Sequence, residues 1–205
     1  MEDFFDAMNK RRNVKTFIQD SYPEKAEIES ILQETIEIAP IKNNIYNFCI
    51  EVYGPEHLKE KGKLVLNTIR DLDKKDLPVE ILRKRYINKT ALFNEQVKAP
   101  YLLVYKKSIN HFNKNDFESG GDTEISAMGA MVHGYIVSIL ANRIDISASF
   151  CACFENKHNL NYIINNRKDF YFMLGLGYAE KKPENYSRVK KEDYLPKLNE
   201  VIKWK

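Results

Sequence analysis

The spacing of apolar residues predicts two main helices in this chain. Apolar side chains recur at helical intervals between Pro23 and Ala39, with Ser21 as a candidate cap. This helix should end at Ala39, because a residue that precedes proline is driven out of the helical region. The second helix, from Asp122 to Asn142, is the most apolar one, and small residues spread around much of its surface. Such a helix is expected to be buried, in the core or in a subunit interface.

Short runs of β-branched and aromatic residues predict the strands. Phe48 to Tyr53 and Tyr101 to Tyr105 are bounded by proline or glycine, and a further strand is expected from Ile144 towards Phe154. Phe170 to Tyr178 forms another strong strand. Its two glycines, at positions 175 and 177, suggest a bulge or the close approach of a ligand.

The rest of the chain connects these elements. Residues 56–98 are highly charged and mostly helical in pattern, with a break at Pro78, whereas residues 108–121 form a polar surface loop. No internal repeat or linker divides the sequence. We therefore expect a single domain over residues 1–205, of the α+β class, with a mixed, mainly antiparallel sheet flanked by helices.

Composition and charge narrow the class of protein. The 205 residues are 43% hydrophobic and 30% charged, values typical of a globular chain and not of a disordered one. The net charge of +3, from 32 basic and 29 acidic residues, is small for a general nucleic-acid binder. The three cysteines do not form a secreted disulfide framework, and no ligand spacing predicts a metal site. An acidic N-terminus and the lack of an apolar run near 18 residues favour a soluble, cytoplasmic protein without a membrane partner.

A basic run, Lys10 to Phe17, is the strongest candidate for chemistry. It contains Arg11, Arg12, Asn13 and Lys15 and follows a short helix with an apolar face. The cations could simply complement the dipole at the end of that helix. Guanidinium groups also form bidentate bonds to phosphate, so the run could equally bind an anion. If the run is extended, Arg11, Asn13 and Lys15 share one side, and Arg12 faces the other way.

Several segments in order along the chain resemble the nitroreductase-like family of flavoproteins. Residues 11–17 are similar to the family's Arg-Arg-Ser-x-Arg/Lys-x-Phe signature, and residues 39–48 to its Ala-Pro-Ser-x-x-Asn-x-Gln-Pro-Trp loop. Ala99-Pro100 with the strand that follows resembles the family's Ala-Pro-apolar strand. The helix at 122–142 looks like its long central helix. Residues 174–178, with Arg188 beyond them, are similar to its Gly-Tyr … Arg ending.

The resemblance implies an enzyme that binds FMN in homodimers, with the long helix at the dimer interface and the cofactor sites built by both subunits. It further implies NADH or NADPH as electron donor and a nitroaromatic, quinone or related small molecule as acceptor, without nucleic acid. No catalytic side chain is required, because the flavin carries the chemistry. The residues expected to bind the cofactor are Arg11, Arg12, Asn13, Lys15, Asn44, Tyr46, Ser149, Cys151, Ala152 and Arg188.

Departures from the family pattern lie in the loop after Ala39. Tyr46, Asn47 and Phe48 replace Gln-Pro-Trp, and Ile41 replaces serine. An alternative is therefore an FMN-binding protein of this fold with specialised or lost reductase activity. A third interpretation is an interaction protein whose basic run and Lys-rich tail contact nucleic acid. His133, in the middle of the apolar helix, is interpreted as a core or interface residue and not as a proton donor.

Overall fold

The computed structural model describes residues 5–8, 11–41, 46–67, 95–108, 123–152 and 170–180. The expected break at Pro78 and nearly all of the polar loop 108–121 lie outside these ranges. Residues 5–8 are helical. The elements that follow are α2 (Lys25–Ile38), β1 (Phe48–Tyr53), η2 (Pro55–His57), α3 (Leu58–Asn67), η5 (Glu95–Lys98), β2 (Tyr101–Lys107), α5 (Thr123–Arg143), β3 (Ser147–Cys151) and β4 (Phe170–Gly177).

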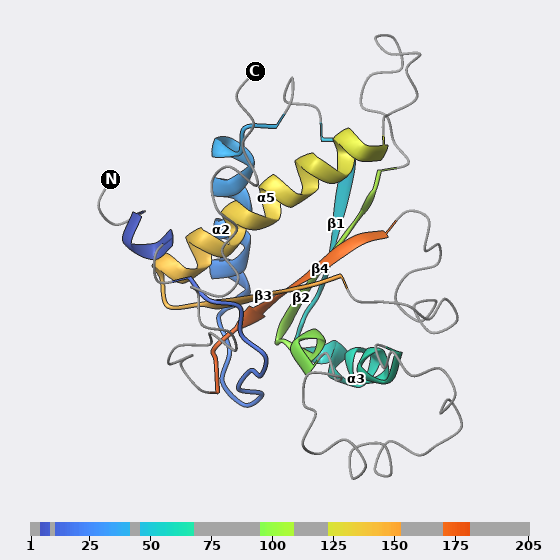
Figure 1. Cartoon of the computed structure of the whole chain (residues 1–205). Helices are drawn as coiled ribbons and strands as arrows, with labels where there is room; N and C mark the ends of the chain where they lie inside the picture. The colour runs from blue at the N-terminus through green and yellow to red at the C-terminus, as the bar shows by residue number, and fades with distance from the viewer. Residues whose placement is uncertain are drawn as a thin grey trace, which may run out of the picture.

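The four strands form one sheet in the order β1-β2-β4-β3, and each neighbouring pair is antiparallel (Figure 1). Leu103 of β2 lies opposite Leu174 of β4, which in turn pairs with Phe150 of β3. A parallel component enters through the basic run, because Asn13 forms an isolated parallel bridge with Ala148. The expected α+β class and mainly antiparallel sheet are confirmed.

Helices α2 and α5 cover one face of the sheet and pack against each other (Figure 1). The core between them contains side chains from both helices and all four strands, including Ile31, Leu103, Leu140 and Leu174. The small residues of α5 let the sheet come close. A Cβ atom at Gly134 would lie 2.8 Å from the ring of Phe172, so a larger residue there would force the helix away from β4.

The glycines of β4 serve packing within the chain. A Cβ atom at Gly175 would lie 2.7 Å from Cβ of Ala99, and one at Gly177 would lie 2.6 Å from Pro100. The only register shift between β2 and β4 lies between Tyr105 and Lys106, away from both glycines. The close approach that the glycines permit is therefore to the segment between η5 and β2, and the expected bulge is not at these positions.

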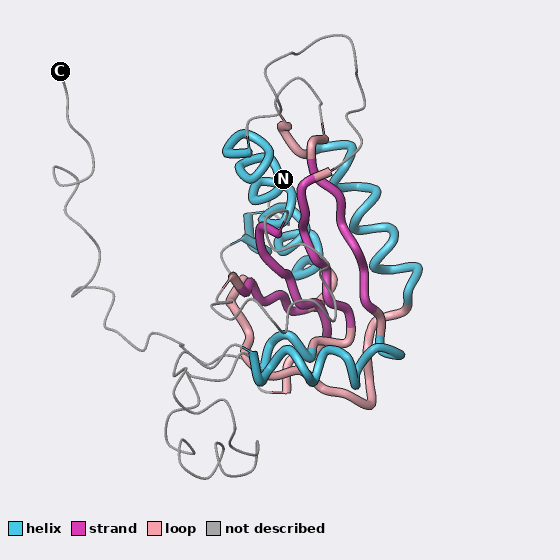
Figure 2. The backbone as a smooth tube through the Cα atoms, turned by 90° about the vertical axis from the view of Figure 1, so that its right-hand side faces the viewer, coloured by secondary structure: helices cyan, strands magenta, loops and turns pink. Residues whose placement is uncertain are grey.

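Lys61 of α3 ties one end of the sheet together (Figure 2 shows α3 lying across that end). Its side chain is fully buried, and its ammonium group donates to the backbone oxygens of Gly54 at 2.8 Å, Ala99 at 2.8 Å and Pro100 at 2.7 Å. Gly54 follows β1, and Pro100 precedes β2. All three ammonium protons thus join α3 to the ends of two strands.

The element boundaries differ from expectation in two places. The cap of α2 is Glu24 and not Ser21: a reciprocal capping box joins Glu24 and Glu27, which satisfies free backbone N–H groups at the helix start. The strand expected from Ile144 starts only at Ser147. A turn precedes it, in which Asp145 has a φ of 62°, the left-handed conformation that often ends a helix.

Helix α5 also presents an apolar stripe to the outside. Ile125, Met128, Met131 and Tyr135 are all at least 37% exposed, and Met128 reaches 68%. The stretch Ile125–Arg143 has a mean hydropathy of 1.4 and the length of a membrane span, and half of it is buried inside the molecule. The expectation that no stretch reaches this length and apolarity is wrong for α5. Burial against the sheet is the ordinary situation of a core helix.

Candidate functional site

The basic run is held along the outer edge of β3. The backbone N–H of Val14 donates to the oxygen of Ala148 at 3.2 Å, and the side-chain oxygen of Asn13 accepts a bond from the N–H of Phe150 at 2.7 Å. The run therefore occupies hydrogen-bonding groups that an edge strand would otherwise leave free. Asn13 had been expected to bond to a cofactor, yet its oxygen serves the backbone of β3, which leaves its amide N–H groups as donors.

The burial of the run is uneven along its length. Val14 and Phe17 are buried together with Ala99, whereas Asn13 is exposed and Lys15 is half-buried. Arg12 is exposed, and its guanidinium donates to the backbone oxygen of Arg11 at 2.9 Å. Val14 and Phe17 are three positions apart, so a strict two-residue alternation does not describe the whole run, and which of its side chains face a cofactor stays a prediction.

Arg11 has the environment of an anion ligand. Its Cζ atom lies 5.6 Å from the centre of the Tyr135 ring, within reach of a cation–π interaction with α5. Its Nε atom is buried and has no hydrogen-bond partner among the described residues. Neither Arg11 nor Lys15 forms an ion pair with any described residue. A buried guanidinium nitrogen without a partner is costly, and a phosphate oxygen is the acceptor that matches its geometry.

The three expected residues of β3 and its end differ in exposure. Ser149 is fully buried, and its hydroxyl has no hydrogen-bond partner in the part of the chain that the structure describes. Cys151 is 3% exposed, and Ala152 is exposed. A ligand on the surface of this chain could touch the backbone of this stretch and Ala152, but not the hydroxyl of Ser149. That this stretch binds a cofactor stays a prediction.

Tyr46 belongs to the aromatic part of the core. Its hydroxyl donates to the backbone oxygen of Ile36 at 2.8 Å, and its ring lies 5.4 Å from that of Phe48 and 6.3 Å from that of His133. This hydroxyl proton is therefore already used within the chain. Asn44 and Arg188, the other two expected ligands, lie outside the described residues.

A buried hydrogen bond joins His133, whose ring packs against Phe48, to Tyr105 of β2. The Nδ1 atom of His133 lies 3.1 Å from the hydroxyl of Tyr105, and His133 is only 1% exposed. Burial lowers the pKa of His133 to about 4 and raises the pKa of Tyr105. Both groups are therefore neutral at physiological pH. The interpretation of His133 as a core residue is confirmed.

A cavity of about 250 Å³ opens near the far end of the basic run. It includes none of the expected ligands, so it is separate from the surface that carries Arg11. No group of three His, Cys, Asp or Glu side chains within the described ranges could hold a metal ion. The cavity is lined by Thr16, Phe17, Gln19, Leu58, Glu95, Lys98 and Glu180.

The structure thus places the segment that carries Arg11, Arg12, Asn13 and Lys15 along the edge of β3. Tyr46 lies apart from them, before β1, where its ring packs near His133 of α5. Sequence reasoning missed the contact between Arg11 and Tyr135. It also missed the exposed stripe of α5. The three-to-four-residue spacing of its apolar side chains carried a signal, but the helix is apolar almost all round, which hid the direction of the stripe.

A basic segment lies on the edge of an antiparallel sheet that is covered by one long apolar helix, so the chain is an α+β protein with a cationic sheet edge. The chain adopts the fold of the nitroreductase-like proteins. It superposes on a nitroreductase-like family protein from Bacillus cereus with a TM-score of 0.63 and 17% identity, covering 94% of each chain.

Two further solved structures show the same fold. A nitroreductase with bound FMN from Desulfitobacterium hafniense has a TM-score of 0.63 and 12% identity, covering 96% of this chain and 98% of its own. An FMN- and NADPH-dependent nitroreductase from Sphigopyxis sp. strain HMH has a TM-score of 0.63 and 14% identity, covering 98% of both chains. No protein-family model matches the sequence, and no curated protein matches it significantly.

Proposed function

We propose that this protein binds FMN through the basic run on the edge of β3 and acts as an NAD(P)H-dependent oxidoreductase. The observation that carries the proposal is the cationic pair of Arg11 and Lys15, which has no acidic partner among the described residues and flanks the exposed amide of Asn13. Such an arrangement suits a phosphate group and a heterocycle that accepts hydrogen bonds. The fold, shared with FMN-bound nitroreductases, supports it.

FMN, when bound, would accept hydride from NADH or NADPH and pass electrons to a nitroaromatic, quinone or related acceptor. The chain's own task is to bind and orient it. Arg11 would pair with the phosphate, and Lys15 would add positive charge that favours a negatively charged reduced ring. The amide N–H groups of Asn13 would donate to the cofactor, and the backbone around Ala152 would lie along the ring.

We further propose a homodimer formed through the exposed stripe of α5. Four apolar side chains at helical spacing, from Ile125 to Tyr135, form an exposed face, and Tyr135 at one end of it contacts Arg11. A face of this kind usually marks an interaction surface. Covering it with the same helix of a second subunit would also bury the Tyr135 ring that contacts Arg11, and so bring the interface to the edge of the cofactor site. We assign the protein to the cytoplasm.

The decisive experiment is an absorption spectrum of the purified protein, before and after addition of FMN. The expected result is a bound flavin spectrum that NADH or NADPH bleaches under anaerobic conditions, and a dimer by light scattering. A protein that stays colourless after incubation with FMN would refute the proposal.

A second candidate is an FMN-binding protein of this fold that has lost or specialised its reductase activity. The observation in its favour is Tyr46, whose ring packs against Phe48 and His133 and whose hydroxyl bonds to Ile36. A residue committed to the core in this way contributes no donor to a cofactor. Uptake of FMN without reduction by either nicotinamide would favour this candidate.

A further inference from the structure

Helix α5 meets the chain around Arg11 at two points. The side-chain amide of Asn142 donates to the backbone oxygen of Ala7 at 3.0 Å, and the N–H of Arg11 donates to the same oxygen at 2.9 Å. Tyr135 lies seven positions before Asn142, two turns away on the same side of α5, and its ring centre is 5.6 Å from Cζ of Arg11. One carbonyl group therefore ties the backbone of Arg11 to α5, and one ring contacts its side chain.

The chain on the other side of Arg11 is fixed to β3. The N–H of Val14 donates to the oxygen of Ala148 at 3.2 Å, and the side-chain oxygen of Asn13 accepts from the N–H of Phe150 at 2.7 Å. Arg11 thus lies between two anchored stretches of backbone. The conformation of its long side chain remains to be fixed, because each of its rotatable bonds has several staggered states.

The contact with Tyr135 orders the guanidinium of Arg11 without using its donors. An acidic partner would accept N–H bonds and neutralise the charge, whereas the face of an aromatic ring attracts the cation and offers no oxygen or nitrogen acceptor. The Nε atom of Arg11 is buried and has no acceptor within the described ranges. The cation is thus held in place and keeps a donor for an anion.

We infer that Tyr135 is a positioning residue for the anion site: its ring holds the guanidinium of Arg11 where that group meets the phosphate of FMN. The inference rests on the proposed function, since it takes the phosphate of FMN as the anion. The ring is the part of Tyr135 that acts, because the ring face attracts the cation. Phenylalanine should therefore replace tyrosine at this position without loss.

The test compares the binding of FMN with that of riboflavin, which has the same ring system and ribityl chain but no phosphate. Tyr135→Leu removes the aromatic ring from the full-length protein, and Tyr135→Phe keeps it. The matched control is Tyr22→Leu, in the segment before α2, because Tyr22 is 46% exposed and Tyr135 is 43% exposed.

Tyr135→Leu should raise the dissociation constant for FMN about two- to five-fold, the effect of a partly exposed cation–π contact, and leave that for riboflavin unchanged. Tyr135→Phe and Tyr22→Leu should bind both flavins as the wild type does. In an Arg11→Ala background, Tyr135→Leu should cause no further loss of FMN affinity, because the ring acts only through Arg11.

Three results would overturn the inference. The first is wild-type affinity for FMN in Tyr135→Leu. The second is an equal loss of affinity for FMN and riboflavin, because the ring would then act on the fold or on the dimer and not on the phosphate contact. The third is a loss in Tyr135→Phe as large as that in Tyr135→Leu, which would assign the effect to the hydroxyl.

A titration with inorganic phosphate separates this inference from the proposed function. In protein with isotope-labelled arginine, the Nε–H signal of Arg11 is identified by its loss in Arg11→Ala. Phosphate should shift this NMR signal in the wild type and in Tyr135→Phe, and shift it less at the same concentration in Tyr135→Leu. If the wild type takes up no flavin, the proposed function fails and this titration decides. An equal shift in the three proteins, or none in the wild type, then overturns the inference.

Discussion

The buried imidazole of His133 makes the fold sensitive to acid. In the folded state burial lowers its pKa to about 4, from an ordinary value of 6.5. Folded His133 therefore stays neutral between these values, while the same residue in the unfolded chain takes up a proton. Because the unfolded state binds more protons in this range, stability falls as the pH falls from 6.5 towards 4. Above 6.5 both states are neutral, and His133 adds no pH dependence.

The size of the effect follows from the shift. About 2.5 pKa units correspond to about 3 kcal/mol of unfolding free energy lost between pH 7 and pH 4. About 2 kcal/mol of this would already be lost at pH 5. His133 is only 1% exposed and donates to or accepts from Tyr105, so solvent does little to screen the cost of charging it. For a domain of ordinary stability, this is a large part of the total.

The assay is urea denaturation at a series of pH values, for the wild type and for His133→Gln. Glutamine is neutral throughout and keeps an acceptor for the Tyr105 hydroxyl. Subtracting one stability curve from the other removes all other titrating groups. We expect the difference to be constant above pH 7 and to shift by about 2 kcal/mol in favour of the variant at pH 5. Parallel curves from pH 7 to pH 4.5 would show that His133 is not held neutral and would refute the reasoning.

Three further predictions concern single side chains. Lys61→Met should lower the unfolding free energy, measured by urea denaturation, by about 3 kcal/mol, because buried carbonyl oxygens lose a charged donor. The control Lys59→Met, at an exposed position, should leave the unfolding free energy nearly unchanged. Arg11→Ala should weaken FMN binding by about 1.5–3 kcal/mol in a fluorescence titration. The control is Lys25→Ala, at a distant exposed site. Equal affinity of the two variants for FMN would show that the phosphate site is misplaced. Asp145→Asn should raise the unfolding free energy by about 0.5–1 kcal/mol and therefore raise the urea midpoint. Asparagine suits the left-handed conformation and removes a negative charge from the C-terminal end of α5. A lower urea midpoint would contradict this.

Local chemistry was enough to predict most of the elements. Strand β1 coincides with the predicted range, because Gly54 and Pro55 end a run of β-forming residues at a defined place. Helix α5 was predicted to within one residue at each end, since its length and apolarity leave no competing structure. The basic run departs from the alternation expected of an extended segment, because its buried residues Val14 and Phe17 are three positions apart.

Contacts between distant segments decided what these patterns could not. Lys61 stands in a helix rich in lysines, and nothing in its neighbourhood distinguishes it from exposed Lys59. Its burial depends on carbonyl groups of Ala99 and Pro100, almost forty positions away in the chain. The role of Gly175 likewise depends on the segment before β2, which no local pattern reveals.

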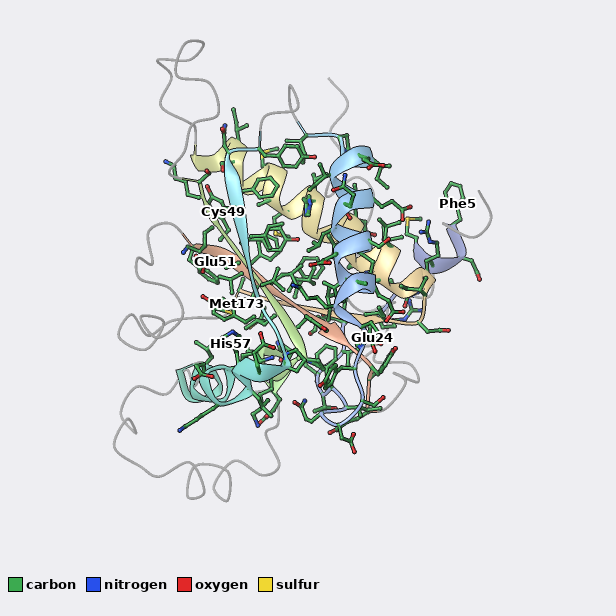
Figure 3. All side chains as sticks on the ribbon, turned by 180° about the vertical axis from the view of Figure 1, so that it is seen from behind. Phe5, Glu24, Cys49, Glu51, His57 and Met173 are labelled. Carbon is green, nitrogen blue, oxygen red and sulfur yellow. The ribbon has the colours of Figure 1, made fainter. Side chains whose placement is uncertain are left out.

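The short helical segment at the N-terminus also shows that a local pattern does not determine burial. Phe5 belongs to the predicted short helix with an apolar face, and in the structure it is 53% exposed and points away from the rest of the molecule (Figure 3). One end of this segment is held by the side-chain amide of Asn142, which donates to the oxygen of Ala7 at 3.0 Å. A composition of apolar residues indicates a face, but not whether this chain covers it.

The sequence by itself determined the α+β class, the positions of the strands and long helices, and the basic run that carries the candidate site. These depend on periodicity, turn residues and charge, which act over a few neighbouring positions. Only the tertiary structure showed that the run lies along β3, that Arg11 meets Tyr135 of α5, and that Lys61 joins α3 to the ends of β1 and β2. Those contacts depend on chain segments tens of residues apart, and their geometry exists only once the sheet and its helices have packed.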